Sequence, residues 1–209
     1  LGYTPAEHAK TLAASGIAQC VYSKEYGEAL SFYAQRDKVT VLAHLKVDTG
    51  MNRLGFSYQE EEEGAYQEML EVCRLPGLYF EGAFTHFAVS DEGADGEAFT
   101  SHQLALFRSL LKRLAGEGIS FPICHTANSA AVLDYPKSHM DMVRAGIILY
   151  GLYPSKKLRN RLALEPVLSL KSVVSHVKTV RPGETVSYGR VYTAQENSRV
   201  ITIPVGYAD

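Results

Sequence analysis

The sequence predicts an α/β fold: part of a TIM-like (β/α)8 barrel, followed by the start of a C-terminal β domain. Within residues 1–153, five apolar segments alternate with helical patterns, as consecutive parallel β/α units do. Within residues 154–209, alternating apolar and polar residues separated by turns replace the helical patterns. A complete barrel of this kind needs about 250 residues, so five units are expected to form an open part of one.

The first two helices are predicted from start and stop signals. Thr4-Pro5-Ala6-Glu7 has a capping residue followed by proline at the first helical position, and Gly16 is expected to end that helix. Ser23 is expected to open the second helix, because apolar residues follow it at helical spacing. The apolar runs 17–22 and 39–47 on either side of this second helix are predicted strands.

Three further units follow. Ser57 and Glu60 have the spacing of a capping box, which predicts a helix that ends before Leu75-Pro76-Gly77. The remaining predicted elements of the barrel are strands at 79–88, 121–126 and 140–149, and helices at 97–115 and 128–133.

The end of the chain has a strand-like pattern. Alternation over 167–180 is followed by apolar stretches at 186–193 and 200–205. Pro182-Gly183 and Glu196-Asn197 fit turns between them. These signals predict a β-rich second domain.

Composition and charge narrow the classes of function. The 209 residues are 46% hydrophobic and 21% charged, which is ordinary for a globular protein, and the net charge of −2 argues against a nucleic-acid partner. There is neither a run of about 18 apolar residues nor a signal-peptide pattern, so no membrane span is expected. Cys20, Cys73 and Cys124 fit neither a disulfide framework nor a zinc site. A reducing cytoplasm is therefore the expected compartment.

Polar residues gather where the predicted strands end, which is where a barrel carries its active site. They are Lys46 and Asp48 with Arg53 beyond them, His86 followed by Ser90 and Asp91, His125 with Asn128 and Ser129, and Arg144 followed by Gly146. Each has a structural alternative, such as a paired lysine, a core histidine, a helix cap or an arginine that bridges loops. We interpret them as one site, because solvated loops predict a scatter rather than four successive strand ends.

One part of this set predicts a phosphate-bearing ligand. Ser129 is expected to open a helix, and Gly146-Ile147 follows the last predicted strand of the barrel. Loops after the last two strands of such barrels frequently bind phosphate. A helix N-terminus offers amide donors, and glycine lets the backbone approach closely. The identity of the ligand stays open at this point.

Six motifs, spread over the whole chain, are more specific. They are LKVDTGMNRLG at 45–55, THFA at 85–88, HTANSAA at 125–131, VRAGI at 143–147 with Tyr150-Gly151, VSYG at 186–189 and GYAD at 206–209. In this order and with these gaps, they resemble the alanine racemase family.

The resemblance implies an N-terminal barrel, a C-terminal β domain and a head-to-tail homodimer that shares its active sites. The implied cofactor is pyridoxal 5'-phosphate, and the implied reaction interconverts L-alanine and D-alanine for peptidoglycan. Two bases work on opposite faces of the substrate: a Schiff-base lysine and a tyrosine from the partner subunit. That lysine is expected upstream of Leu1, so the chain is expected to be an internal piece that is inactive alone.

The resemblance also implies catalytic roles. Tyr207 matches the tyrosine base, and His86 matches a histidine of the same hydrogen-bond network. Arg144 matches the arginine opposite the pyridine nitrogen, where an always-charged donor keeps that nitrogen unprotonated and limits side reactions. Arg53 matches the arginine near the substrate carboxylate, and Lys46 matches a lysine whose carbamate holds that arginine.

The implied cofactor contacts come from two stretches. Ser129, Gly146 and Ile147 match phosphate-binding positions, and His125 and Asn128 match supporting ones.

Two alternatives stay open beside the racemase. One is a serine racemase domain of the glycopeptide-resistance type, because the residues that separate the two substrates are expected beyond Asp209. In either racemase, Asp91 matches a position at the substrate entrance. The other is a pyridoxal-phosphate-binding barrel without racemase activity, although that family lacks the β strands predicted after residue 167.

Overall fold

The computed structural model describes residues 3–60, 62–158 and 162–206. Its contacts divide the chain into two compact units, Leu1–Pro166 and Val167–Asp209. The domain boundary expected after residue 153 stays a prediction. Within the described ranges, no helix has both the length and the apolar character needed to cross a membrane.

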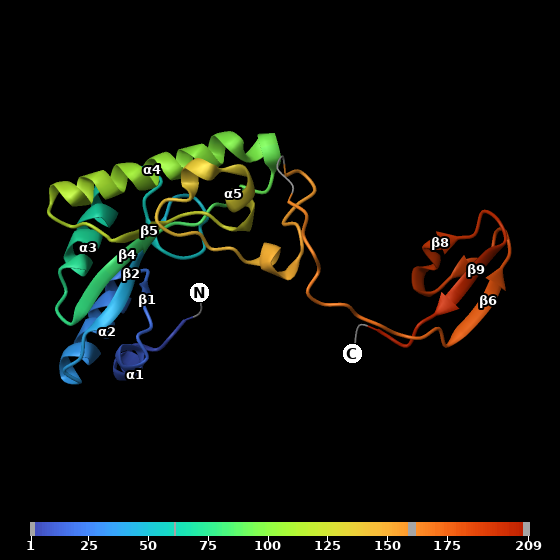
Figure 1. Cartoon of the computed structure of the whole chain (residues 1–209), viewed down its shortest axis with the longest axis horizontal. Helices are drawn as coiled ribbons and strands as arrows, with labels where there is room; N and C mark the ends of the chain where they lie inside the picture. The colour runs from blue at the N-terminus through green and yellow to red at the C-terminus, as the bar shows by residue number, and fades with distance from the viewer. Residues whose placement is uncertain (1–2, 61, 159–161, 207–209) are drawn as a thin grey trace. The chain divides into compact units, whose positions relative to one another are not determined.

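The first unit is built on a parallel sheet in which β1, β2, β4 and β5 pair in that order (Figure 1). The bounds are β1 Gln19–Val21, β2 Val41–Asp48, β4 Leu78–Phe84 and β5 Ile123–His125, with a short β3, Phe56–Ser57, beside the end of β2. All these pairings are parallel, which confirms four of the five predicted strands and their parallel arrangement.

Helices connect these strands and cover one face of the sheet (Figure 1). They are α1 Ala9–Ala14, α2 Lys24–Arg36, α3 Glu63–Cys73, α4 Glu97–Gly116 and α5 Ser129–Asp134. Single 3-10 turns occupy Ala6–His8, Gly93–Gly96, Pro136–Ser138 and Ile147–Tyr150. The main apolar core lies between this face and the first four helices.

Strand β2 separates two environments, because successive side chains of a strand point to opposite faces. Ala43, Leu45 and Val47 are fully buried in the core that the helices cover. His44 and Lys46 alternate with them and line cavities instead. The unit therefore gathers polar side chains on the sheet face that the main core does not use.

Two helix starts were predicted from serine and threonine caps, with different outcomes. Ser23 is confirmed: its Oγ accepts the backbone N–H of Tyr26 at 3.2 Å, and α2 begins at the next residue. The Thr4 cap is wrong, because helical structure begins with a 3-10 turn at Ala6 that has Pro5 as its cap and no side-chain capping bond.

The capping box predicted at Ser57 and Glu60 is also wrong. Ser57 pairs with Asp48 in β3, so its backbone is extended rather than poised to begin a helix. Helix α3 begins at Glu63 instead. A non-local strand pairing has overridden the local signal.

The strand predicted over 140–149 does not form. The segment makes two separated backbone bonds, from Asp141 N–H to Cys124 O in β5 and from Arg144 N–H to Ala127 O beyond the end of β5, both at 3.0 Å. The Asp141 carboxylate takes the N–H of Cys124 at 2.9 Å, a donor that a continuing ladder would need. Arg144 therefore lies in a loop rather than at a strand end.

The second unit consists of two antiparallel pairs, in agreement with the predicted β-rich domain. They are β6 His176–Val180 with β9 Ser198–Thr202, and β7 Thr185–Val186 with β8 Tyr192–Thr193. Of the strand predicted over 167–180, only the last five residues form one. Residues 167–175 belong to no strand, although Ser175 N–H donates to Thr202 O of β9 at 2.9 Å.

We expect Gly55→Ala to destabilise the first unit. Gly55 has φ +124°, and an added Cβ would lie 2.9 Å from both Asp48 N and Lys46 O. Strain of this kind costs on the order of 1–3 kcal/mol, which urea denaturation would measure. The control is Gly64→Ala on α3, where a Cβ meets nothing within 4 Å and alanine is the better helix former. Equal denaturation midpoints for the two variants would contradict this account.

Candidate active site

A cavity of about 490 Å³ brings together most of the residues predicted to form a site. Its volume is in the range of small-molecule sites. The predicted residues that line it are His86, Asp91, Asn128, Ser129, Arg144, Gly146 and Ile147.

Three other predicted residues lie in two neighbouring cavities. Lys46 and Arg53 line one of about 240 Å³, and His125 lines another of about 340 Å³. Arg144 borders this last cavity as well as the larger one, so it is the side chain that joins them. Tyr207 lies outside the described residues.

The guanidinium of Arg144 is held by uncharged acceptors. Its Nη2 donates its two hydrogens to Thr85 O at 2.9 Å and Thr126 O at 3.1 Å, and it also lies 3.2 Å from His86 Nδ1. Its Nη1 donates to His125 Nδ1 at 2.5 Å. Burial lowers the pKa of Arg144 to about 10, so the group stays charged at neutral pH. The result is a fixed cation at the edge of both cavities.

The two histidines must be neutral to accept these bonds. Burial, reinforced by the charge of Arg144, lowers the pKa of His86 to about 4 and that of His125 to about 3. Because guanidinium can only donate, each Nδ1 presents a lone pair to it and each Nε2 carries the proton. The contacts with Arg144 therefore fix the tautomers of His86 and His125.

The other side of the main cavity presents hydrogen-bond donors. Asn128 caps α5, since its Oδ1 accepts the N–H of Ala131 at 3.0 Å and the hydroxyl of Ser90 at 2.9 Å. Gly146 N–H donates to Ser129 Oγ at 2.8 Å, which leaves the Ser129 hydroxyl hydrogen to point elsewhere. The first turn of a helix also has N–H groups without helical partners. These donors suit an anion.

The loop that carries Arg53 is shaped by a single carboxylate oxygen. Oδ1 of buried Asp48 accepts the backbone N–H of Gly50 at 2.9 Å, of Met51 at 2.8 Å and of Asn52 at 3.1 Å. Three donors on one oxygen curl the chain sharply at the end of β2. Asp48 therefore organises this loop.

Lys46 is an unusual buried lysine. Its Nζ donates to Val47 O at 2.6 Å. Burial lowers its pKa to about 8; the charge of Asp48 opposes the shift, while Arg144 and Arg53 add to it. A substantial fraction of the amine is therefore neutral just above neutral pH.

The sequence interpretation missed His44. Its Nδ1 lies 2.8 Å from His125 Nε2, and its Nε2 lies 3.4 Å from a carboxylate oxygen of Glu81. The signal was available, because His44 precedes Lys46 by two residues on a strand and must share its face.

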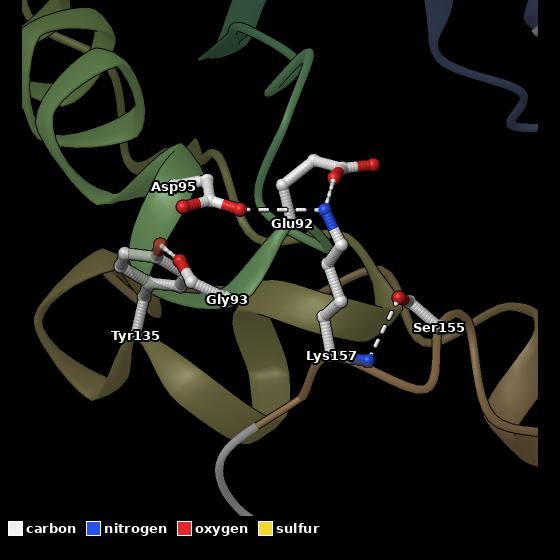
Figure 2. Close-up of polar contacts among 6 residues, drawn as sticks. All are labelled: Glu92, Gly93, Asp95, Tyr135, Ser155 and Lys157. Atoms are coloured by element: carbon white, nitrogen blue, oxygen red, sulfur yellow. Dashed lines mark hydrogen bonds and ion pairs between the residues drawn. The ribbon is translucent and has the colours of Figure 1, made fainter.

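The loop that carries Asp91 is tied to residues 154–158 (Figure 2). The ammonium of Lys157 lies 2.7 Å from Glu92 Oε2 and 3.3 Å from Asp95 Oδ2. Exposed pairs of this kind contribute little to stability, so they adjust the loop rather than hold the fold. They keep Pro154, which lines the main cavity, beside this loop.

Comparisons with known proteins agree along the whole chain. Residues 1–154 match the family model described as "Alanine racemase, N-terminal domain", and residues 167–209 match "Alanine racemase, C-terminal domain". The chain is 46% identical over 209 residues to an alanine racemase of Desulfovibrio desulfuricans, covering all of this chain and 55% of that relative. The chain thus spans about half the length of the curated relatives it matches.

Solved structures are similar as well. An alanine racemase of Clostridium difficile 630 has a TM-score of 0.81 at 39% identity, over 100% of this chain and 54% of that one. A histidine racemase of Leuconostoc mesenteroides has a TM-score of 0.74 at 31% identity, over 100% of this chain and 55% of that one. The same fold therefore serves more than one amino acid.

We expect Lys46→Met to stabilise the protein at neutral pH in carbon dioxide-free buffer. Folding lowers the pKa of Lys46 from 10.5 to about 8, so below pH 8 the buried charge costs on the order of 3 kcal/mol. This cost disappears as the pH rises from 8 to 10.5, because the folded state loses its proton first. Urea denaturation at several pH values would measure it.

The control is Lys112→Met, which removes an exposed lysine of α4. Its effect on the free energy of unfolding should be small and constant over the same range. A Lys46→Met advantage that does not shrink with rising pH would contradict the buried-charge explanation.

Proposed function

Because this chain belongs to the alanine racemase family, we propose that the complete protein is a pyridoxal-phosphate-dependent racemase that interconverts L-alanine and D-alanine. The observation that carries the proposal is Arg144, a fixed cation between neutral acceptors at the edge of a ligand-sized cavity. The family resemblance supports a homodimer, a cytoplasmic location and a role of D-alanine in peptidoglycan.

Pyridoxal phosphate fits the donors that the cavity offers. Ser129, Gly146 and Ile147 line one side of the cavity and would hold the phosphate. Arg144 would donate to the pyridine nitrogen. When bound, the cofactor supplies an electron sink that acidifies the Cα–H of the amino acid.

Arg144 limits that sink. With a pKa of about 10, it keeps its own proton at neutral pH and would leave a pyridine nitrogen opposite it unprotonated. Arg144 would thereby permit proton exchange at Cα and disfavour side reactions. The uncharged acceptors around Arg144 matter here, because a carboxylate in their place would neutralise it.

Proton movement at Cα is assigned to two bases. Tyr207 would exchange the proton on one face, and the cofactor-binding lysine of the complete protein would exchange it on the other. His86, neutral and bonded to Arg144, would belong to the hydrogen-bond network of Tyr207. Arg53 would bind the substrate carboxylate, and Asp91 would lie at the substrate entrance.

Alanine is favoured as the substrate by the family match, and two alternatives remain as proposals. A serine racemase would share these residues, and the similar histidine racemase shows that substrate choice varies on this fold. Values of kcat/KM for L-alanine, L-serine and L-histidine would discriminate among the three. A barrel that binds the cofactor without activity would turn over none of them.

Tyr207→Phe should affect the two enantiomers unequally. The change removes the proton-accepting oxygen and keeps the ring, so cofactor binding should persist. Loss of a general base lowers a rate by about 10²–10⁴-fold. We expect that loss for solvent deuterium exchange at Cα of L-alanine, which the tyrosine would face, and a smaller loss for D-alanine.

Mixing tests whether Tyr207 acts across a dimer. A variant that lacks the cofactor lysine, mixed with Tyr207→Phe, should regain activity through one intact hybrid site. Equal exchange losses for both enantiomers, with no recovery on mixing, would mean that Tyr207 is a packing residue.

Lys46 should carry a carbamate in the complete protein. Its lowered pKa makes neutral amine available, and the amine nitrogen would attack carbon dioxide and release one proton. The new anion would lie beside Arg53, which lines the same cavity and would be held by it. Carbon-13 NMR with labelled bicarbonate should show a carbamate signal that Lys46→Ala lacks; no signal in the unaltered protein would exclude the modification.

A further inference from the structure

A row of hydrogen-bonded side chains leads from Arg144 away from the main cavity. Arg144 Nη1 contacts His125 Nδ1 at 2.5 Å, and His125 Nε2 contacts His44 Nδ1 at 2.8 Å. His44 Nε2 then lies 3.4 Å from Glu81 Oε1. The row thus links a cation on one side to a carboxylate on the other through two imidazole rings.

The charged ends fix the direction of every bond in the row. Arg144 can only donate, so His125 accepts at Nδ1 and carries its proton on Nε2. That proton is donated to Nδ1 of His44, whose own Nε2 proton points to Glu81. A single arrangement of protons satisfies all three contacts while both rings are neutral.

The backbone is shaped to bring His44 and Glu81 together. Along the pairing of β2 with β4, the register passes from Ala43–Phe80 to His44–Gly82, so Glu81 is an extra residue in β4. A bulge of this kind redirects side chains and is common beside active sites. Here it places Glu81 at the far nitrogen of His44.

Gly82 makes room for the same ring. A Cβ on Gly82 would lie 2.4 Å from Cε1 and 2.5 Å from Nδ1 of His44, closer than any real contact. Glycine is needed here for space, and the space is filled by the imidazole. The bulge and the glycine are independent features that serve one contact.

Aromatic packing fixes the inner ring. Phe84 stacks on His125 with centroids 4.7 Å apart and an interplanar angle of 11°. The same phenyl ring meets His44 at a steeper angle, 6.4 Å away. The two imidazoles therefore have little freedom to rotate out of the row.

We propose that His44 and Glu81 are positioning residues: His44, oriented by Glu81, accepts the Nε2 proton of His125, and the pair holds that ring in place and thereby keeps Arg144 directed into the cofactor cavity. They touch neither the proposed cofactor nor the substrate and act through Arg144. The arrangement of these side chains does not depend on the cofactor, whereas its effect on cofactor binding rests on the proposed function.

The first test locates the imidazole protons by NMR, in the complete protein without cofactor. Nitrogen-15 spectra of its histidines should show neutral Nε2–H tautomers for His44 and His125. His44→Phe leaves the Nε2 proton of His125 without an acceptor, so the His125 Nε2–H resonance should lose its hydrogen-bonded shift, while the tautomer set by Arg144 stays. His44→Asn offers an oxygen near the position of Nδ1 and should restore that shift.

The second test measures the affinity for the cofactor. His44→Phe and Glu81→Leu should each weaken binding of pyridoxal phosphate by about tenfold, the size expected for one lost hydrogen bond to the network. His44→Asn should remain near the unaltered protein. The matched control is Glu28→Leu on the exposed side of α2, which should change neither readout.

Gly82→Ala gives an independent route to the same effect, because it displaces His44 without altering it. Should it fail to fold, the two His44 variants and Glu81→Leu still decide the matter. An unchanged His125 spectrum in His44→Phe, with unchanged cofactor affinity, would overturn the proposal. If the His125 spectrum responds as expected but the protein neither binds the cofactor nor racemises, the proposed function is refuted and the arrangement of the four side chains is still supported.

Discussion

The charge of Arg144 is the constraint on which the rest of the site depends. A guanidinium withdrawn from water is tolerated only when its donors are satisfied. Thr85, His86, His125 and Thr126 satisfy them, and these residues follow β4 or end β5. Arg144 thus ties two strand ends to its own loop, and it dictates the protonation of both histidines.

Arg144 also contributes to the positive charge of the site. Arg144, Arg53 and Lys46 lie close enough that the two arginines lower the pKa of the lysine. Positive charges gathered in this way repel each other unless anions join them. A phosphate, a substrate carboxylate or a carbamate would each add negative charge beside these cations, in addition to that of Asp48.

Local signals predicted an element correctly where no distant partner competed. Ser23 caps α2 and Asn128 caps α5 with bonds a few residues along the chain. The helix cap predicted at Ser57 is wrong, because the backbone of Ser57 pairs with β2 instead. No strand forms over 140–149, because the segment makes one backbone bond to β5 and one to Ala127 beyond it, and the Asp141 side chain occupies the Cys124 N–H that a ladder would need.

The sequence by itself determined the parallel β/α pattern, the family resemblance and most of the residues that line the cavities, because these depend on periodicity and on motifs read along the chain. Only the tertiary structure decided that His44 meets Glu81. That contact depends on a register shift between β2 and β4 and on the space above Gly82. Register and space are set by residues far apart in the chain, which no local pattern specifies.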